Sequence, residues 1–381
     1  MRQTKIFLFI ILLCMVGVAK AVETTDKVVI SELKVTPGSS DVYFFTVSLQ
    51  GSDVNYTAYQ ADLQLPAGME FAYNNSGKLR VSMMKPSIYP YSVEEEENEE
   101  GEMVETKAYT HTLSSNIIES NTLRVAVFSS ANEEFTATSG SLFKVYVKAS
   151  PYLKPGDVNI GVKNVKLITV DETKYEPADY TSTSVKAEAT STISLKVLAE
   201  NLYGTCILPF EYTLPTDGSL EAYTCSTYNS DVLFLDKVEK MEAYTPYILR
   251  SATGFTGTLS GTVDATLYPE EGMVQRGLLV GTIVTKELTE GSYVMQNQGN
   301  GTMFYRVGET PFLLAAGKCY VTLPEGITTT AFSLGGTTGI EAVQAPSDNS
   351  QQPIYNLSGQ RVDRMSSGQM YIIDGQKVIT K

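Results

Sequence analysis

The chain has one histidine, His111, so any imidazole-dependent chemistry would have to use it. A Ser–His–Asp triad also needs a nucleophile on a Gly-x-Ser-x-Gly elbow, and no serine or cysteine here has that setting. Zinc sites built on two or more histidines are impossible, and the cysteines form no Cys-x-x-Cys pair. We therefore expect His111, in "YTHTLSS", to be a packed or half-exposed strand residue. No enzyme activity, catalytic residue, metal site or cofactor is predicted.

Carboxylates are the next candidates, because a glycosidase needs only two of them about 5 to 10 Å apart. The chain has 43 acidic residues, so composition alone does not exclude this alternative. The densest run is "SVEEEENEEGEMVET", with eight glutamates between Glu94 and Glu105. Such a block repels itself and stays in water, which predicts an exposed loop. Low-affinity calcium binding is the alternative, although consecutive glutamates lack the spaced ligands of a calcium loop.

Aromatic side chains could bind glycans by stacking on sugar rings. Tryptophan is absent and tyrosine is abundant at 23 residues. Tyr89 and Tyr91, in "SIYPYSV", lie beside the acidic run and are the candidate glycan contacts. Tyrosine is also a common strand residue, so an ordinary packing role stays open for both.

The first 21 residues have the pattern of a secretory signal peptide, with Arg2 and Lys5 before an apolar run. We expect cleavage after Ala21 and a secreted or cell-surface protein. Acylation at Cys14 is a second alternative, which Leu13 disfavours because lipoprotein signals need a small residue there. No other stretch approaches the roughly 20 apolar residues of a transmembrane helix.

The net charge of −14 becomes −17 without the signal, which removes three basic residues and no acids. A strongly acidic protein repels polyanions, so nucleic acid is not an expected partner.

Almost every later segment alternates apolar and polar residues with period two and is rich in Val, Ile, Tyr, Phe and Thr. Strands are predicted in the first part of the chain at 27–35, 42–50, 56–66, 122–130, 141–149 and 158–170. Others are predicted at 205–215, 231–238, 246–252, 276–284 and 291–307, the last with Asn300-Gly301 as a two-residue turn. The fold class predicted is all-β, with tandem β-sandwich domains and a short β-hairpin tail.

Changes in composition along the chain predict the domain boundaries. A first domain is expected at 22–190, ending in the Ser/Thr-rich stretch 177–192, and a second at 191–334. Residues 335–352 form a polar linker, and 353–381 form a terminal β segment with Asp374-Gly375 as a turn.

Three cysteines follow the signal, Cys206, Cys225 and Cys319, and an odd number excludes a disulfide framework. Cys206 and Cys225 could pair in an oxidising compartment, and buried free thiols are the alternative.

The terminal segment "IYNLSGQRVDRMSSGQMYIIDGQKVITK" resembles the C-terminal sorting module of proteins exported by the type IX secretion system of certain Gram-negative bacteria, the Bacteroidetes. The resemblance implies a surface protein and recognition of the tail by the export machinery. The positions that carry it most clearly are Tyr355, Gly359, Val362, Gly368, Tyr371, Gly375, Lys377 and Lys381.

The first domain resembles the cohesin-like sandwiches of such bacteria through "NYTAYQADLQLPAGMEF", "HTLSSN" and "LRVAVFSSANEEFTATSGSLFKVYVKA". This resemblance implies a nine-stranded jelly-roll sandwich. The function expected is non-catalytic binding or adhesion to a protein or glycan partner through sandwich faces. A carbohydrate-binding module and, less favoured, a glycosidase are the alternatives.

Overall fold

The computed structural model describes residues 22, 24–51, 53–85, 87–97, 102–299 and 301–335, and four short strands between 354 and 379. Apart from a single 3-10 turn, η1 (Ala265–Leu267), every regular element in these ranges is a strand. The all-β class predicted from the period-two pattern is therefore confirmed. Among these residues there is no helix with the length and apolar character needed to span a membrane.

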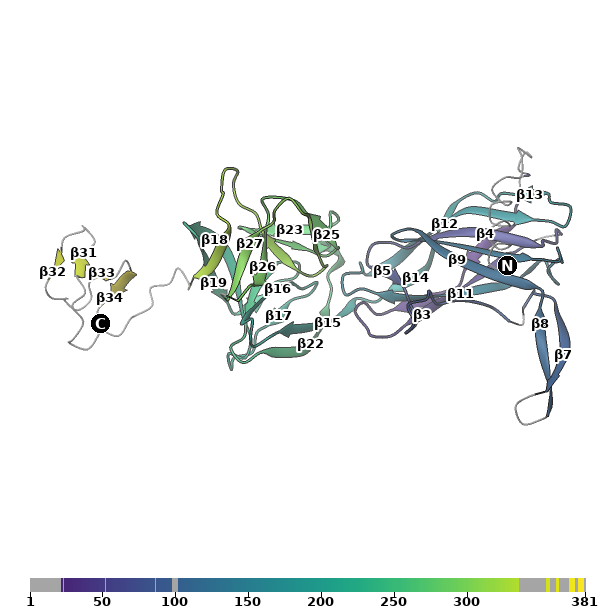
Figure 1. Cartoon of the computed structure of the whole chain (residues 1–381), viewed down its shortest axis with the longest axis horizontal. Helices are drawn as coiled ribbons and strands as arrows, with labels where there is room; N and C mark the ends of the chain where they lie inside the picture. The colour runs from purple at the N-terminus through teal and green to yellow at the C-terminus, as the bar shows by residue number, and fades with distance from the viewer. Residues whose placement is uncertain are drawn as a thin grey trace. The chain divides into compact units, whose positions relative to one another are not determined.

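Two sheets face one another in the first compact unit, which comprises residues 1–193 and 258–268 (Figure 1). The first sheet contains β1 (Lys27–Ile30), β3 (Tyr43–Gln50), β11 (Ser139–Ala149) and β5 (Met69–Phe71) in that order, with β6 (Val81–Met83) also on β11. The second contains β2 (Leu33–Val35), β14 (Tyr180–Ala187), β12 (Gly156–Ile168), β4 (Ala58–Gln64), β10 (Thr122–Ser129) and β9 (His111–Glu119), with β13 (Lys174–Tyr175) on β12. This is a β-sandwich.

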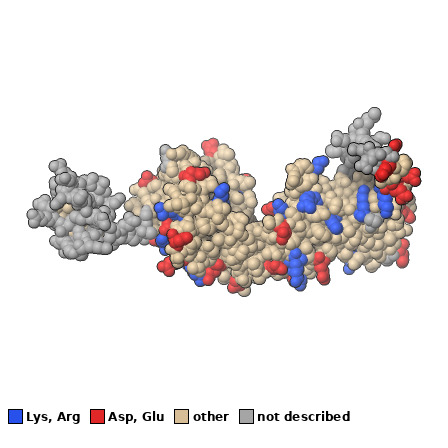
Figure 2. All heavy atoms as spheres, turned by 90° about the horizontal axis from the view of Figure 1, so that it is seen from below, with Lys and Arg blue, Asp and Glu red and all other residues tan. Residues whose placement is uncertain are grey.

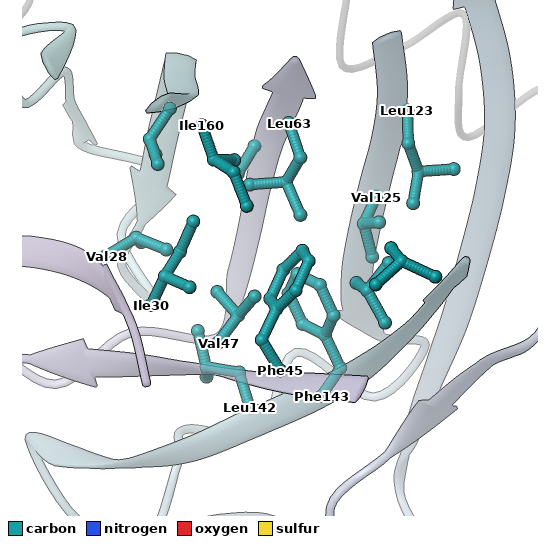
Figure 3. Close-up of a cluster of buried hydrophobic side chains, with 14 of the residues drawn as sticks. Val28, Ile30, Phe45, Val47, Leu63, Leu123, Val125, Leu142, Phe143 and Ile160 are labelled. Atoms are coloured by element: carbon teal, nitrogen blue, oxygen red, sulfur yellow. The ribbon is translucent and has the colours of Figure 1, made fainter. Parts of the chain in front are cut away.

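Alternation along each strand builds the core between the two sheets. In β10 the burial pattern follows the sequence, with Leu123, Val125 and Val127 fully buried and Arg124 on the other face. Figure 3 shows the side chains that meet in the middle of the sandwich, which include Val28, Ile30, Phe45, Val47, Leu142 and Phe143 from one sheet and Leu63, Leu123, Val125 and Ile160 from the other.

The Ser/Thr-rich stretch expected at the domain boundary contains strand β14, which pairs with β12 and β2. Its four consecutive hydroxyl residues, 181–184, precede Val185 and Ala187, which are buried with Lys186 exposed between them, so the composition hides a strand pattern. The next strand, β15 (Thr190–Val197), pairs with β22 (Phe255–Thr262), and the Val263 N–H donates to the Ala189 carbonyl at 2.7 Å. The boundaries at 190 and 334 stay predictions.

The second unit comprises residues 194–257 and 269–381. Its main sheet runs β16 (Tyr203–Ile207), β21 (Pro246–Arg250), β18 (Glu221–Asn229), β19 (Val232–Val238), β30 (Ala331–Gly335), β27 (Thr302–Arg306), β26 (Tyr293–Asn297), β29 (Cys319–Val321), β24 (Leu279–Thr282) and β23 (Met273–Arg276). Two smaller ribbons pair β17 (Tyr212–Thr213) with β20 (Lys240–Met241) and β25 (Lys286–Leu288) with β28 (Phe312–Leu314).

The hairpin predicted at Asn300-Gly301 exists, but its turn is longer than expected. Asn297 pairs with Thr302, so four residues separate β26 and β27 rather than two. Gly299 and Gly301 both have φ near 90°, a region that favours glycine. The local Asn-Gly signal therefore located the hairpin but not its register.

Cys206, Cys225 and Cys319 are all free and buried, so the alternative of a Cys206–Cys225 disulfide is wrong. Burial raises the pKa of Cys206 and of Cys225 to about 12. The Cys319 thiol donates to the Cys206 carbonyl oxygen at 3.1 Å, as a weak donor inside the core.

The tail forms a small antiparallel sheet of its own, in the order β32 (Arg361–Val362), β31 (Ile354–Asn356), β33 (Met370–Ile373) and β34 (Gln376–Ile379). The strands predicted on both sides of Asp374-Gly375 are confirmed, because Ile373 pairs with Gln376. The signal peptide with Ala21, and the linker from 336 onward, lie outside the described residues.

Candidate functional site

The acidic run forms a two-stranded antiparallel ribbon made of β7 (Tyr91–Glu97) and β8 (Met103–Tyr109), which corrects the expectation of a loop. Tyr91 pairs with Tyr109 at its base and Glu97 with Met103 farther out. Figure 1 shows the ribbon extending away from the two sheets of the first unit. Within the described chain neither strand pairs with any other, so the outer edges of both leave backbone N–H and C=O groups unpaired in ladders.

Buried aromatic residues hold both ends of the ribbon. Tyr89 precedes β7 and is 1% exposed, and His111 follows β8 and is 3% exposed. Their rings lie 5.5 Å apart, and both rings pack on Phe135 at 5.7 and 4.9 Å. Because one aromatic cluster holds both ends of the ribbon, the part of the ribbon next to the sandwich, which we call its base, has a fixed position.

Hydrogen bonds orient these anchors. The Tyr89 hydroxyl donates to the Leu142 carbonyl at 2.7 Å and lies 3.3 Å from the Tyr59 hydroxyl. His111 contacts the Thr57 carbonyl through Nε2 at 3.1 Å and the Thr110 hydroxyl through Nδ1 at 3.0 Å. Burial lowers the pKa of His111, so the imidazole is neutral at pH 7. Of the two environments predicted for His111, packed or half-exposed, the structure shows the packed one.

Cation–π contacts cover the base of the ribbon. Lys107 Nζ lies 4.3 Å from the centre of the Tyr91 ring, and Lys85 Nζ lies 4.4 Å from that of Tyr109. The two tyrosine rings are 5.3 Å apart. These contacts add roughly 0.5–1 kcal/mol each at exposed sites. They stiffen a ribbon that two strands alone would leave only marginally stable.

The candidate glycan contacts fall in different environments. Tyr89 has the packing role that the sequence left open, because its ring is buried in the anchoring cluster and has no face open to a sugar. Tyr91 is 42% exposed, but the Lys107 ammonium lies over its ring. A glycan role for Tyr91 stays a prediction.

Repulsion dominates the outer part of the ribbon. The register places Glu95 directly opposite Glu105, and like charges in that position destabilise a strand pair. Residues 91–109 hold eight glutamates and one lysine, a net charge of −7. The ribbon also exposes apolar side chains, with Val93 56%, Met103 63% and Val104 42% exposed. It therefore combines negative charge, apolar contacts and open backbone edges.

Elsewhere, charges are mixed. Figure 2 shows acidic and basic side chains interspersed over the described residues of the face it presents, without a broad basic patch. Asp62 is 1% exposed and is neutralised by a bidentate contact from Arg124, with both distances 2.7 Å, and by Asn164 at 2.8 Å. The Asp62 carboxylate therefore has a structural role, because Arg124 and Asn164 already bind its oxygens.

Metal binding finds no support within the described residues, where no group of three or more His, Cys, Asp or Glu side chains is placed to hold an ion. Residues 98–101 of the acidic run lie outside that set, so the calcium alternative stays a prediction.

The sorting-like positions are only partly described. Tyr355, Val362, Tyr371 and Lys377 lie in strands β31 to β34, and Tyr371 is 4% exposed. The remaining positions of that motif, Gly359, Gly368, Gly375 and Lys381, lie outside the described residues. A role in sorting stays a prediction.

Comparison with known proteins found no matching family model and no matching curated protein. Among solved structures, the chain is similar to a non-cellulosomal cohesin from Archaeoglobus fulgidus, with 12% identity over 43% of this chain and 91% of that chain at a TM-score of 0.28. It is also similar to a chain of a type I cohesin–dockerin complex from Clostridium thermocellum, with 16% identity over 43% of this chain and 99% of that chain at a TM-score of 0.29. A third similar structure is the sixth cohesin of scaffoldin B from Acetivibrio cellulolyticus, in complex with a dockerin. Its identity is 13% over 43% of this chain and 100% of that chain, and its TM-score is 0.30. At these scores the similarity supports no inference about partner or activity.

Proposed function

We propose that this chain is a non-catalytic exported binding protein that docks a basic protein partner on the β7–β8 ribbon. The observation that carries the proposal is the ribbon itself, which is acidic, exposes apolar side chains and has two unpaired edges. A cluster of buried aromatic residues holds both of its ends. A secreted or surface location, with the tail read by an export machinery, is part of the proposal and rests on the sequence pattern of the two termini.

An extended basic segment fits this ribbon best. An added strand satisfies the open backbone edge, as in other cases of β-strand addition. Lysine or arginine side chains of that segment would neutralise the facing Glu95 and Glu105, whose mutual repulsion is relieved on binding. Apolar side chains on the same face of that segment as its lysines would cover Val93 and Met103, which share one face of the ribbon with Glu95 and Glu105. An extended segment with basic and apolar side chains therefore complements the open edges, the negative charge and the exposed apolar side chains of the ribbon.

Binding of a fluorescein-labelled peptide of the repeat Lys-Thr-Val-Thr to the full chain tests this proposal, because this repeat puts lysine and valine on the same face of a strand. We expect saturable binding that weakens as salt rises, because the attraction is between exposed charges. Glu95→Gln combined with Glu105→Gln should weaken binding about 2- to 30-fold, from roughly 0.2–1 kcal/mol for each lost ion pair. The matched control is Glu287→Gln with Glu309→Gln, the same charge change at exposed sites of the second unit.

A second pair of variants separates apolar contact from charge. Val93→Ser with Met103→Ser should weaken binding with no change in its salt dependence. Leu267→Ser, at an apolar residue 55% exposed elsewhere, should leave binding unchanged. An affinity equal in the ribbon and control variants, or no binding at low salt, would show that the ribbon is not the docking site.

A further inference from the structure

The second unit contains a hollow of about 460 Å³ lined by residues of β15, β16, β26, β27, β28 and β29. All of its lining residues belong to that unit. Its apolar side is formed by Val197, Val294 and Leu314, which are 3%, 3% and 7% exposed. Leu313, 68% exposed, is another lining residue. The hollow therefore offers an apolar wall that is open to solvent on one side.

The only charged residues that line the hollow in the described chain are two lysines, Lys196 and Lys318. Neither ammonium has an ion-pair or hydrogen-bond partner among the described residues. By contrast, Lys237 pairs with Glu221 at 2.5 Å and Lys240 with Glu211 at 2.5 Å in the same unit. In a chain with a net charge of −14, a hollow with two lysines and no carboxylate is locally cationic.

Gly204 lines the hollow at a position where the backbone conformation does not require a glycine. Its φ is not in the left-handed region, and a Cβ there would meet only Val197 Cγ2, at an ordinary 3.6 Å. Neither a turn nor a close backbone approach therefore explains a glycine in strand β16. Glycine weakens a strand, so its presence beside a hollow indicates that space is kept for another group.

We propose that this hollow binds an amphipathic carboxylate, a small organic acid whose apolar chain lies on the wall formed by Val197, Val294 and Leu314. The carboxylate would be held by Lys196 and Lys318, with the Asn201 side chain, which also lines the hollow, as a neutral polar neighbour. A hollow of this size, with an apolar wall and with polar residues such as Thr205, Gln296 and Thr302 elsewhere in its lining, is typical of small-ligand sites. The site is independent of the β7–β8 ribbon, so either proposal can fail alone.

Calorimetric titration of the full chain with octanoate tests the site, with octanol and octyltrimethylammonium as neutral and cationic probes of the same length. We expect octanoate to bind and the cationic probe not to bind. Lys196→Met with Lys318→Met keeps the apolar stems and should weaken octanoate at least about fivefold while leaving octanol unchanged. The control, Lys27→Met with Lys34→Met, makes the same change at exposed lysines of the first unit and should bind like the parent.

Gly204→Val tests the location, because its side chain would fill the hollow from a strand position that tolerates a Cβ. It should abolish octanoate binding while the melting temperature stays within a few degrees of the parent. Octanoate binding that survives Gly204→Val in the folded protein, equal affinity in both lysine pairs, or no binding of octanoate at millimolar concentration would each overturn the proposal.

Discussion

Tyr89→Phe removes one hydroxyl from the aromatic cluster that anchors the ribbon. That hydroxyl donates to the Leu142 carbonyl at 2.7 Å, so its oxygen is the acceptor for the Tyr59 hydroxyl at 3.3 Å. The Leu142 carbonyl keeps a second donor, the Met84 N–H at 3.0 Å. The hydroxyl of Tyr59, a residue only 1% exposed, loses its partner.

The expected cost follows from that one orphaned group. A buried polar group left without a hydrogen bond costs about 1–3 kcal/mol. For a domain of this size, each kcal/mol lowers the melting temperature by about 2–4 °C, so we expect a fall of about 2–12 °C. Scanning calorimetry of the full chain measures it, and hydrogen exchange in β9 and β10 assigns the change to the first unit.

Tyr91→Phe is the matched control. It makes the same chemical change two residues away, on a ring that is 42% exposed and whose hydroxyl can bond to water. We expect a change within about 0.5 kcal/mol. If the two variants melt alike, the hydroxyl chain from Tyr59 through Tyr89 does not stabilise the base of the ribbon, and the anchoring argument is wrong.

Three further predictions concern two titrating groups, His111 and Glu221, and the reactivity of the cysteines. Burial lowers the pKa of His111 from 6.5, so the unfolded chain binds this proton first; stability of the first unit should fall as pH drops through 6.5 and level off below the folded pKa. His111→Gln should flatten that slope in urea midpoints measured across pH. The bond from Lys237 lowers the pKa of Glu221 from 4.5 to about 2, helped by Arg250. Its stabilising contribution should hold above pH 4.5 and disappear towards pH 2, and Glu221→Gln should remove this dependence. The three buried cysteines should resist iodoacetamide in the folded chain and all react in urea without reductant, as counted by mass spectrometry. A pair that reacts only after reduction would contradict the free-thiol assignment.

The sequence by itself determined the strands. The alternation in segments such as 122–130 and 141–149 predicts which residues point inward, because a strand's side chains alternate between its two faces. It also favoured an ordinary strand position for His111, since nothing around it resembled a reactive site. These are properties of short segments, which local pattern and propensity decide.

Only the tertiary structure decided the candidate sites. Tyr89 and Tyr91 look equivalent in "SIYPYSV", yet one is buried and the other exposed, because Tyr89 packs against Phe135, 46 residues later in the chain. In β7 the glutamates outnumber the apolar residues Tyr91 and Val93, so the sequence predicts a loop where the structure has a ribbon. The hollow beside Gly204 gathers residues from 196 to 319. No local pattern records such distant contacts, since they arise only when separate strands pack together.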